Sequence, residues 1–171
     1  MEEAHKYVFA DLDALNEDAL TCVIGSPDRS AKLRLAPLDA KWGGNIESMC
    51  GTSFYLMPDG MERFRAAGWA VRVKSEPNDQ LLEEMLRKNL SENDYEPNWF
   101  SSKTLVLLGS ELSDSLRQLV ERHLESGWRV RFYSFNPRGA RMSVRLKEKY
   151  PSSFKNKYLD GVDWELMRTG S

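Results

Sequence analysis

Cysteine, histidine and long apolar runs are all scarce in this chain of 171 residues. Its two cysteines, Cys22 and Cys50, form neither a CxxC pair nor a zinc-like spacing, which favours a reduced, intracellular protein, cytoplasmic or nuclear. With His5 and His123 as its two histidines, a His-based metal centre or a Ser-His-Asp triad is poorly supported. No apolar run approaches the roughly 18 residues of a membrane span, and the acidic N-terminus lacks an apolar signal stretch. We therefore expect neither secretion nor a membrane partner.

What the chain does contain indicates a single globular domain, residues 1–171. An apolar fraction of 41% and five tryptophans argue against disorder, and this length suffices to bury a core. Residues 25–51 interrupt the regular strand and helix patterns, so we expect a long insertion or loop there.

Basic residues concentrate near the C-terminus. The net charge of the chain is −2, but residues 128–159 contain nine basic side chains and one acidic one, interleaved with seven aromatic residues. Cations neutralise phosphates and aromatic rings stack on bases, so this cluster predicts a polyanion surface, although each residue alone could serve a solvated face or the core. The phosphate contacts that we expect are Lys74, Arg138, Arg141, Arg145 and Lys147.

Strand and helix patterns alternate along the chain, and two segments repeat the order strand, helix, glycine, strand. The expected elements are strands near 7–13, 52–57, 69–73, 103–108 and 128–132, helices over 61–67, 81–90 and 113–126, and a helical tail from 143 that breaks at Pro151 and resumes near 160–166. Such alternation implies right-handed crossovers and a parallel sheet. We predict a three-layer α/β/α domain, Rossmann-like, with a mainly parallel central sheet of four to five strands.

Two carboxylates end the first expected strand. If the strand continues through residue 13, Asp11 and Asp13 lie on the same face, because side chains alternate along a strand. Neighbouring carboxylates at a buried strand end repel each other and persist most easily beside a hard cation or a basic partner. Alternatively, Asp13 caps a helix that starts at Ala14, and Asp11 is a solvated strand end.

Further acids follow two later strands. Asp79 lies at the start of one expected helix, and Glu111 and Asp114 flank the start of another. Ligands of open parallel sheets bind outside the carboxyl ends of the strands, so these acids could converge on Asp11. Such a cluster would hold one or two Mg²⁺ or Mn²⁺ ions and activate water for attack on a phosphodiester, although each acid alone could be an N-cap.

The order of these motifs resembles a known family. The resemblance rests on the strand ending in Asp11, on Lys74 followed by Asp79, on the run Gly109-Ser110-Glu111-Leu112-Ser113-Asp114, and on Ser143-x-x-Leu146 after a Gly-x-x-Val strand. Over roughly residues 6–160 it is similar to the NYN domain of the PIN-like ribonucleases. The resemblance implies that Asp11 is the first metal-binding aspartate, with Asp13 beside it, and that Asp79 is the second.

The third motif departs from the family pattern, which reads approximately Ser-Gly-Asp-x-Asp-Phe. Glu111 replaces its first aspartate and Ser113 its second, with Asp114 shifted by one position. This degeneracy allows a weakened relative that only binds RNA. We expect a domain that binds single-stranded RNA, either a divalent-metal-dependent endoribonuclease or its weakened form; the chain leaves open a homodimer or protein partner. The expected catalytic residues are Asp11, Asp13, Asp79 and Glu111, and the expected metal ligands are Asp11, Asp79, Glu111 and Asp114.

Two other hypotheses stay open. The run Phe9-Ala10-Asp11-Leu12-Asp13 also resembles the first motif of haloacid-dehalogenase-type phosphatases, in which the first aspartate is the nucleophile and the second the general acid. Leu15 stands where that family has Thr or Val. The remaining hypothesis is a scaffold for protein or RNA interaction without chemistry.

Overall fold

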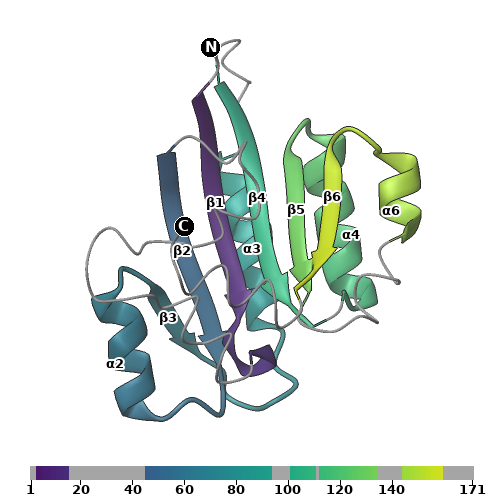
Figure 1. Ribbon diagram of the computed structural model, residues 1–171. Coiled ribbons are helices and arrows are strands. Elements are labelled where there is room, and N and C mark those ends of the chain that lie inside the picture. The colour runs from purple at the N-terminus through teal and green to yellow at the C-terminus, as the bar shows by residue number, and fades with distance from the viewer. Residues whose placement is uncertain (1–2, 16–44, 94–100, 111, 135–143, 160–171) are drawn as a thin grey trace.

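The computed structural model describes residues 3–15, 45–93, 101–110, 112–134 and 144–159. Its elements in chain order are β1 (Glu3–Asp11), the 3-10 turn η1 (Leu12–Ala14), β2 (Asn45–Ser53), α2 (Pro58–Ala66), β3 (Ala70–Val73), α3 (Leu81–Asn93), β4 (Ser101–Gly109), α4 (Asp114–Glu125), β5 (Arg129–Ser134), α6 (Val144–Lys149) and β6 (Phe154–Tyr158). The six strands form one sheet in the order β3-β2-β1-β4-β5-β6, and all neighbouring pairs are parallel (Figure 1).

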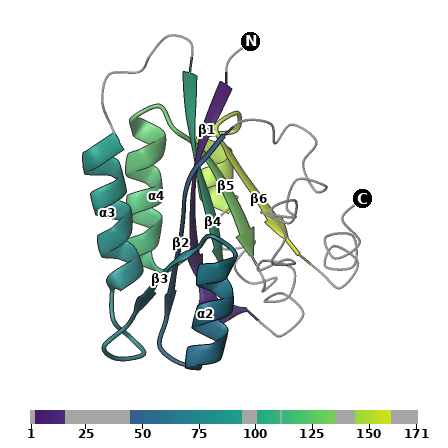
Figure 2. The same cartoon turned by 90° about the vertical axis from the view of Figure 1, so that its left-hand side faces the viewer.

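Helices cover both faces of this sheet. In Figure 2, α3 and α4 lie side by side on one face and α2 lies on the other. Alternation along β1 supplies both cores: Val8 packs in the cluster that contains Phe64 of α2, whereas Phe9 packs in the cluster that contains Leu86 of α3 and Leu124 of α4. The expected three-layer α/β/α architecture is confirmed. Among the described residues, no helix is long and apolar enough to cross a membrane.

Two glycines end helices in the repeated segments. Gly68 follows α2 with φ 101°, and Gly127 follows α4 with φ 90°. This left-handed conformation is accessible to glycine without steric cost. Each glycine turns the chain so that the next residue, Trp69 or Trp128, is buried against the sheet.

The sheet is larger than expected, with six strands instead of four to five. β2 begins at Asn45, inside the segment expected to be a loop, and ends at Ser53 rather than continuing to residue 57. β6 lies in the tail that was expected to be helical or irregular. Its sequence, Phe-Lys-Asn-Lys-Tyr, does not alternate apolar and polar residues, as is common for a strand at the edge of a sheet. Backbone hydrogen bonds pair it with β5.

The aromatic residues of the basic segment are mostly core residues. Trp128, Phe132, Tyr133 and Phe154 are all buried, so these rings are closed to nucleic-acid bases. Tyr158 at the end of β6 is exposed. The interpretation of this segment as a stacking surface is therefore wrong for the four buried rings, which pack between the sheet and its helices.

Candidate functional site

The carboxyl edge of the sheet is the end at which ligands of open α/β folds bind. It is the lower end in Figure 1, to which the strand arrows point. The strand order reverses between β1 and β4: the chain continues from β1 towards β2 and from β4 towards β5. In open α/β folds, ligands bind at such a switch point. Asp11, the last residue of β1, lies at this point.

Asp11 ends the strand and caps the turn that follows. Its carboxylate accepts a hydrogen bond from the backbone N–H of Asp13 at 3.2 Å, as N-cap of η1. Because the strand stops at Asp11, the expectation that Asp11 and Asp13 share a face of a continuing strand is wrong. The 3-10 turn redirects Asp13 towards β2.

Lys74 is the cationic partner of Asp11. It follows β3, two strands away, and its backbone N–H donates to the carbonyl of Ser53 at 2.8 Å. Its Nζ lies 3.8 Å from Asp11 Oδ1, with 10% of the Lys74 side chain and 31% of the Asp11 side chain exposed. Burial raises the pKa of Asp11; Lys74 opposes that shift and the negative charge of Asp13 adds to it. The Asp11 carboxylate is therefore costly to keep ionised, even with the ammonium beside it.

Asp13 is engaged by the loop that joins β2 to α2. Its carboxylate accepts from the Ser53 hydroxyl at 2.6 Å, from the Phe54 N–H at 2.7 Å and from the Tyr55 N–H at 3.2 Å. The Ser53 hydroxyl in turn accepts from the N–H of Leu56 at 2.9 Å. Asp13 therefore fixes this loop against η1, a role that neither the metal nor the helix-cap interpretation anticipated.

Asp79 and Asp114 are also engaged in local structure. Asp79 Oδ2 accepts from the hydroxyl and the N–H of Ser75, at 2.7 and 3.0 Å. These bonds, the hydroxyl bond first, hold the pKa of Asp79 below its ordinary value. Asp114 begins α4 with its side chain 85% exposed and pairs with Arg117 at 3.0 Å. Ser113 is the N-cap of α4, as expected, and accepts from the Leu116 N–H at 3.3 Å.

The predicted metal ligands thus do not gather within the described part of the chain, where no group of three His, Cys, Asp or Glu residues could hold a metal ion. Glu111 lies outside the described residues, as do Arg138 and Arg141. The residues that the structure brings together at this edge are Asp11, Lys74 and Asp13 with its loop. Binding of Mg²⁺ or Mn²⁺ stays a prediction.

The other expected phosphate contacts lie across the sheet from Lys74. Arg145 and Lys147 are exposed on α6, beyond the β6 edge (Figure 1). The Nζ of Lys74 lies beside Asp11 at the end of β1, and three strand spacings, or roughly 14 Å, separate β1 from β6. A ligand that contacts both Lys74 and α6 must therefore be an extended molecule.

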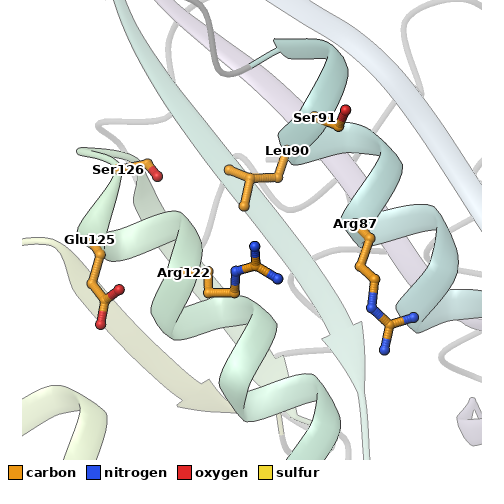
Figure 3. Close-up of a pocket in the computed structure, with 6 residues that line it drawn as sticks. All are labelled: Arg87, Leu90, Ser91, Arg122, Glu125 and Ser126. Carbon is orange, nitrogen blue, oxygen red and sulfur yellow. The ribbon is translucent and has the colours of Figure 1, made fainter.

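Two hollows elsewhere do not coincide with Asp11. One, of about 470 Å³, lies between α3 and α4 and is lined by Arg87 of α3 and by Arg122 and Glu125 of α4 (Figure 3). The last turns of both helices border this hollow, near the edge of the sheet at which the strands begin. The other, of about 380 Å³, lies between α3 and the β1-β2-β3 side of the sheet and includes Cys50 and Arg72. Neither holds a residue predicted for the site.

The sequence patterns did not point to three partners of Asp13: Ser53, the last residue of β2, and Phe54 and Tyr55 of the β2–α2 loop. The pattern over 52–57 predicts a strand, which is correct for Ser53 but would place Phe54 and Tyr55 within the sheet as well. A signal was present, because Pro58 favours the first turn of a helix and requires the preceding strand to end earlier.

Taken together, the strand order and the position of Asp11 define a doubly wound, all-parallel α/β domain with a polar site at its topological switch point. No protein-family model matches the chain, and the curated proteins give no significant match. The crystal structure of VPA0982, a Vibrio parahaemolyticus protein of unknown function, is similar, with a TM-score of 0.57 and 14% identity over 94% of this chain and 95% of that one. This similarity shows the fold.

Proposed function

We propose that this protein binds single-stranded RNA across the carboxyl edge of its sheet and is a catalytically weakened relative of the metal-dependent endoribonucleases. The observation that carries the proposal is the Asp11–Lys74 pair at the switch point. A partly buried carboxylate with a raised pKa costs folding stability at neutral pH, and such groups cluster at functional sites. The neighbouring ammonium supplies a contact for a phosphate.

The other predicted acidic residues that the structure describes already have partners within the protein, which supports a catalytically weakened relative. Asp13, Asp79 and Asp114 each have hydrogen-bond or ion-pair partners nearby. Mg²⁺ is commonly held by one or two carboxylates together with substrate phosphates. Asp11 and Glu111 are then the predicted ligands that remain. We expect their affinity for a divalent ion to be low in the free protein and higher when RNA is bound.

The hydrogen bonds of Asp13 count against the phosphatase hypothesis. A general acid must carry a proton before it can donate one. Two backbone N–H groups and the Ser53 hydroxyl donate to Asp13, and together they engage both of its carboxylate oxygens. The geometry therefore favours a structural role for Asp13 over proton donation.

Binding can be tested by fluorescence anisotropy with a labelled single-stranded RNA of about 20 nucleotides, against duplex RNA of the same length. Lys74→Gln should weaken binding roughly threefold to tenfold and reduce the slope of log affinity against log salt by about 0.7–1, the contribution of one phosphate contact. Lys88→Gln is the matched control, because Lys88 is an exposed lysine of α3 that pairs with Glu92. Absence of binding at low salt, or equal effects of the two variants, would contradict the proposal.

Cleavage is a separate measurement on the same RNA. Incubation with Mn²⁺ should give slow cleavage or none, and any cleavage should disappear in Asp11→Asn. Rapid cleavage that survives Asp11→Asn would place the chemistry elsewhere. Release of phosphate from an aryl phosphate, with an Asp11 adduct, would instead support the phosphatase hypothesis.

A further inference from the structure

The loop between β2 and α2 exposes two adjacent aromatic rings. Phe54 is 39% and Tyr55 68% exposed, and their rings meet edge to face with centroids 5.0 Å apart. Met57 and Val73 are exposed as well. Large rings that are exposed to water forgo the favourable burial that a core position would give them. This loop lies at the carboxyl edge, at the bottom of Figure 1 between β2 and α2.

The backbone that carries these rings is held in place by Asp13. The Phe54 N–H and the Tyr55 N–H both donate to its carboxylate, at 2.7 and 3.2 Å. Asp13 follows Asp11 by two residues, and the Asp13 N–H donates to Asp11. One short hydrogen-bonded unit therefore links the rings to the Asp11–Lys74 pair. Such preorganisation lowers the entropy cost of binding a ligand.

We propose that Phe54 and Tyr55 form a base-stacking platform for the single-stranded RNA, and that Asp13 is the positioning residue of this platform. The inference rests on the proposed function and names the part of the site that contacts bases. Proteins that bind single strands combine a cation for the backbone with aromatic faces for the bases. Lys74 supplies the cation on the same edge, while the two rings supply the faces. Because the rings are nearly perpendicular, with 89° between their planes, they suit one or two splayed bases rather than a stacked helix.

The platform predicts a preference for single-stranded over duplex RNA, which phosphate contacts by cations alone do not predict. Every base has an aromatic face, so binding should tolerate changes of sequence. A duplex keeps its bases stacked and paired, so it should not gain from the rings. We therefore expect single-stranded RNA to bind more tightly than duplex RNA of the same length, and this preference to depend on Phe54 and Tyr55.

The test uses a single-stranded RNA that carries 2-aminopurine, whose fluorescence falls when the base stacks. Phe54→Leu and Tyr55→Leu should each lower affinity roughly fivefold to a hundredfold, the range for loss of one stacking ring, and should reduce the quenching. Because stacking is not ionic, the salt slope should stay unchanged, in contrast to Lys74→Gln. Met57→Leu is the matched control, since it changes an exposed apolar side chain near the same loop. Tyr55→Trp should retain both affinity and quenching.

The position of Asp13 is tested by Asp13→Asn, which leaves both rings in the chain. It should lower affinity and quenching like the ring variants, again with an unchanged salt slope, while the circular dichroism spectrum confirms folding. If both leucine variants keep normal affinity and quenching while Lys74→Gln binds RNA more weakly, the stacking platform is overturned but RNA binding is not. The rings would then suit a protein partner. Failure of the unmodified protein to bind RNA at low salt would overturn both proposals.

Discussion

Replacing Asp13 with alanine removes the carboxylate that fixes the β2–α2 loop and should lower the stability of the fold. Three donors lose their acceptor: the Ser53 hydroxyl and the N–H groups of Phe54 and Tyr55. Hydrogen bonds to a charged group contribute about 1.5–3 kcal/mol each, but the two N–H groups lie at exposed positions where water replaces the carboxylate. The buried Ser53 bears most of the loss. We expect a decrease of about 2–4 kcal/mol in the free energy of unfolding.

The assay is urea unfolding followed by tryptophan fluorescence, supported by thermal unfolding, where each kcal/mol corresponds to about 2–4 °C for a domain of this size. Asp114→Ala is the matched control, because that carboxylate is mostly exposed and pairs only with Arg117 of the same helix among the described residues. Its expected cost is about 1 kcal/mol or less. An Asp13→Ala variant within about 0.5 kcal/mol of the unmodified protein would show that Asp13 does not hold the loop, since changes of that size are typical of unconstrained surface positions.

Three more outcomes follow from the described contacts. Asp11→Asn should stabilise the fold at neutral pH, because the raised pKa of Asp11 means that the native state binds the carboxyl proton more tightly than the unfolded chain does. The stability of the unmodified protein therefore falls as pH rises above the ordinary value of 3.8, and the stability gained by Asp11→Asn should be smaller when unfolding is measured near pH 4. Gly51→Ala should cost about 1–3 kcal/mol by urea unfolding, because a Cβ there would lie 2.7 Å from Cδ1 of Leu12; a neutral effect would show that η1 shifts freely. Leu86→Ala should cost about 2–5 kcal/mol in the same assay, since Leu86 is fully buried between α3 and the sheet; a cost below 1 kcal/mol would contradict that packing.

The sequence predicted elements well where the signal was local. The leucine and valine spacing of α4, with Ser113 as its cap, predicted a helix over 113–126, and the structure has it at Asp114–Glu125. The glycines at 68 and 127 predicted helix ends that the structure confirms. Each of these signals acts over a few residues, through side-chain periodicity or a left-handed backbone conformation, so it is legible in the chain itself.

The errors occurred where neighbouring chain segments decided the outcome. Asn45–Ser53 is a strand because β1 and β3 pair with it on both sides, although its small and polar residues lack strand alternation. β6 forms by backbone pairing with β5. Trp128, Phe132 and Phe154 face inward because they pack on the α3 and α4 side of the sheet, and Tyr133 because it packs on the α2 side, which composition alone does not reveal.

The class of fold, the alternation of strands and helices, and the placement of Asp11 at a strand end are all predictable from the chain, because periodicity and turn chemistry are properties of short segments. The partners of each acid come instead from the packing of segments that are distant in the sequence. Asp11 pairs with Lys74, the residue after β3, Asp13 accepts hydrogen bonds from the β2–α2 loop, and Asp79 accepts them from Ser75. Hydrogen bonds between Asp13 and residues 40 to 42 positions away depend on the register of β1 against β2, which is set when the sheet assembles.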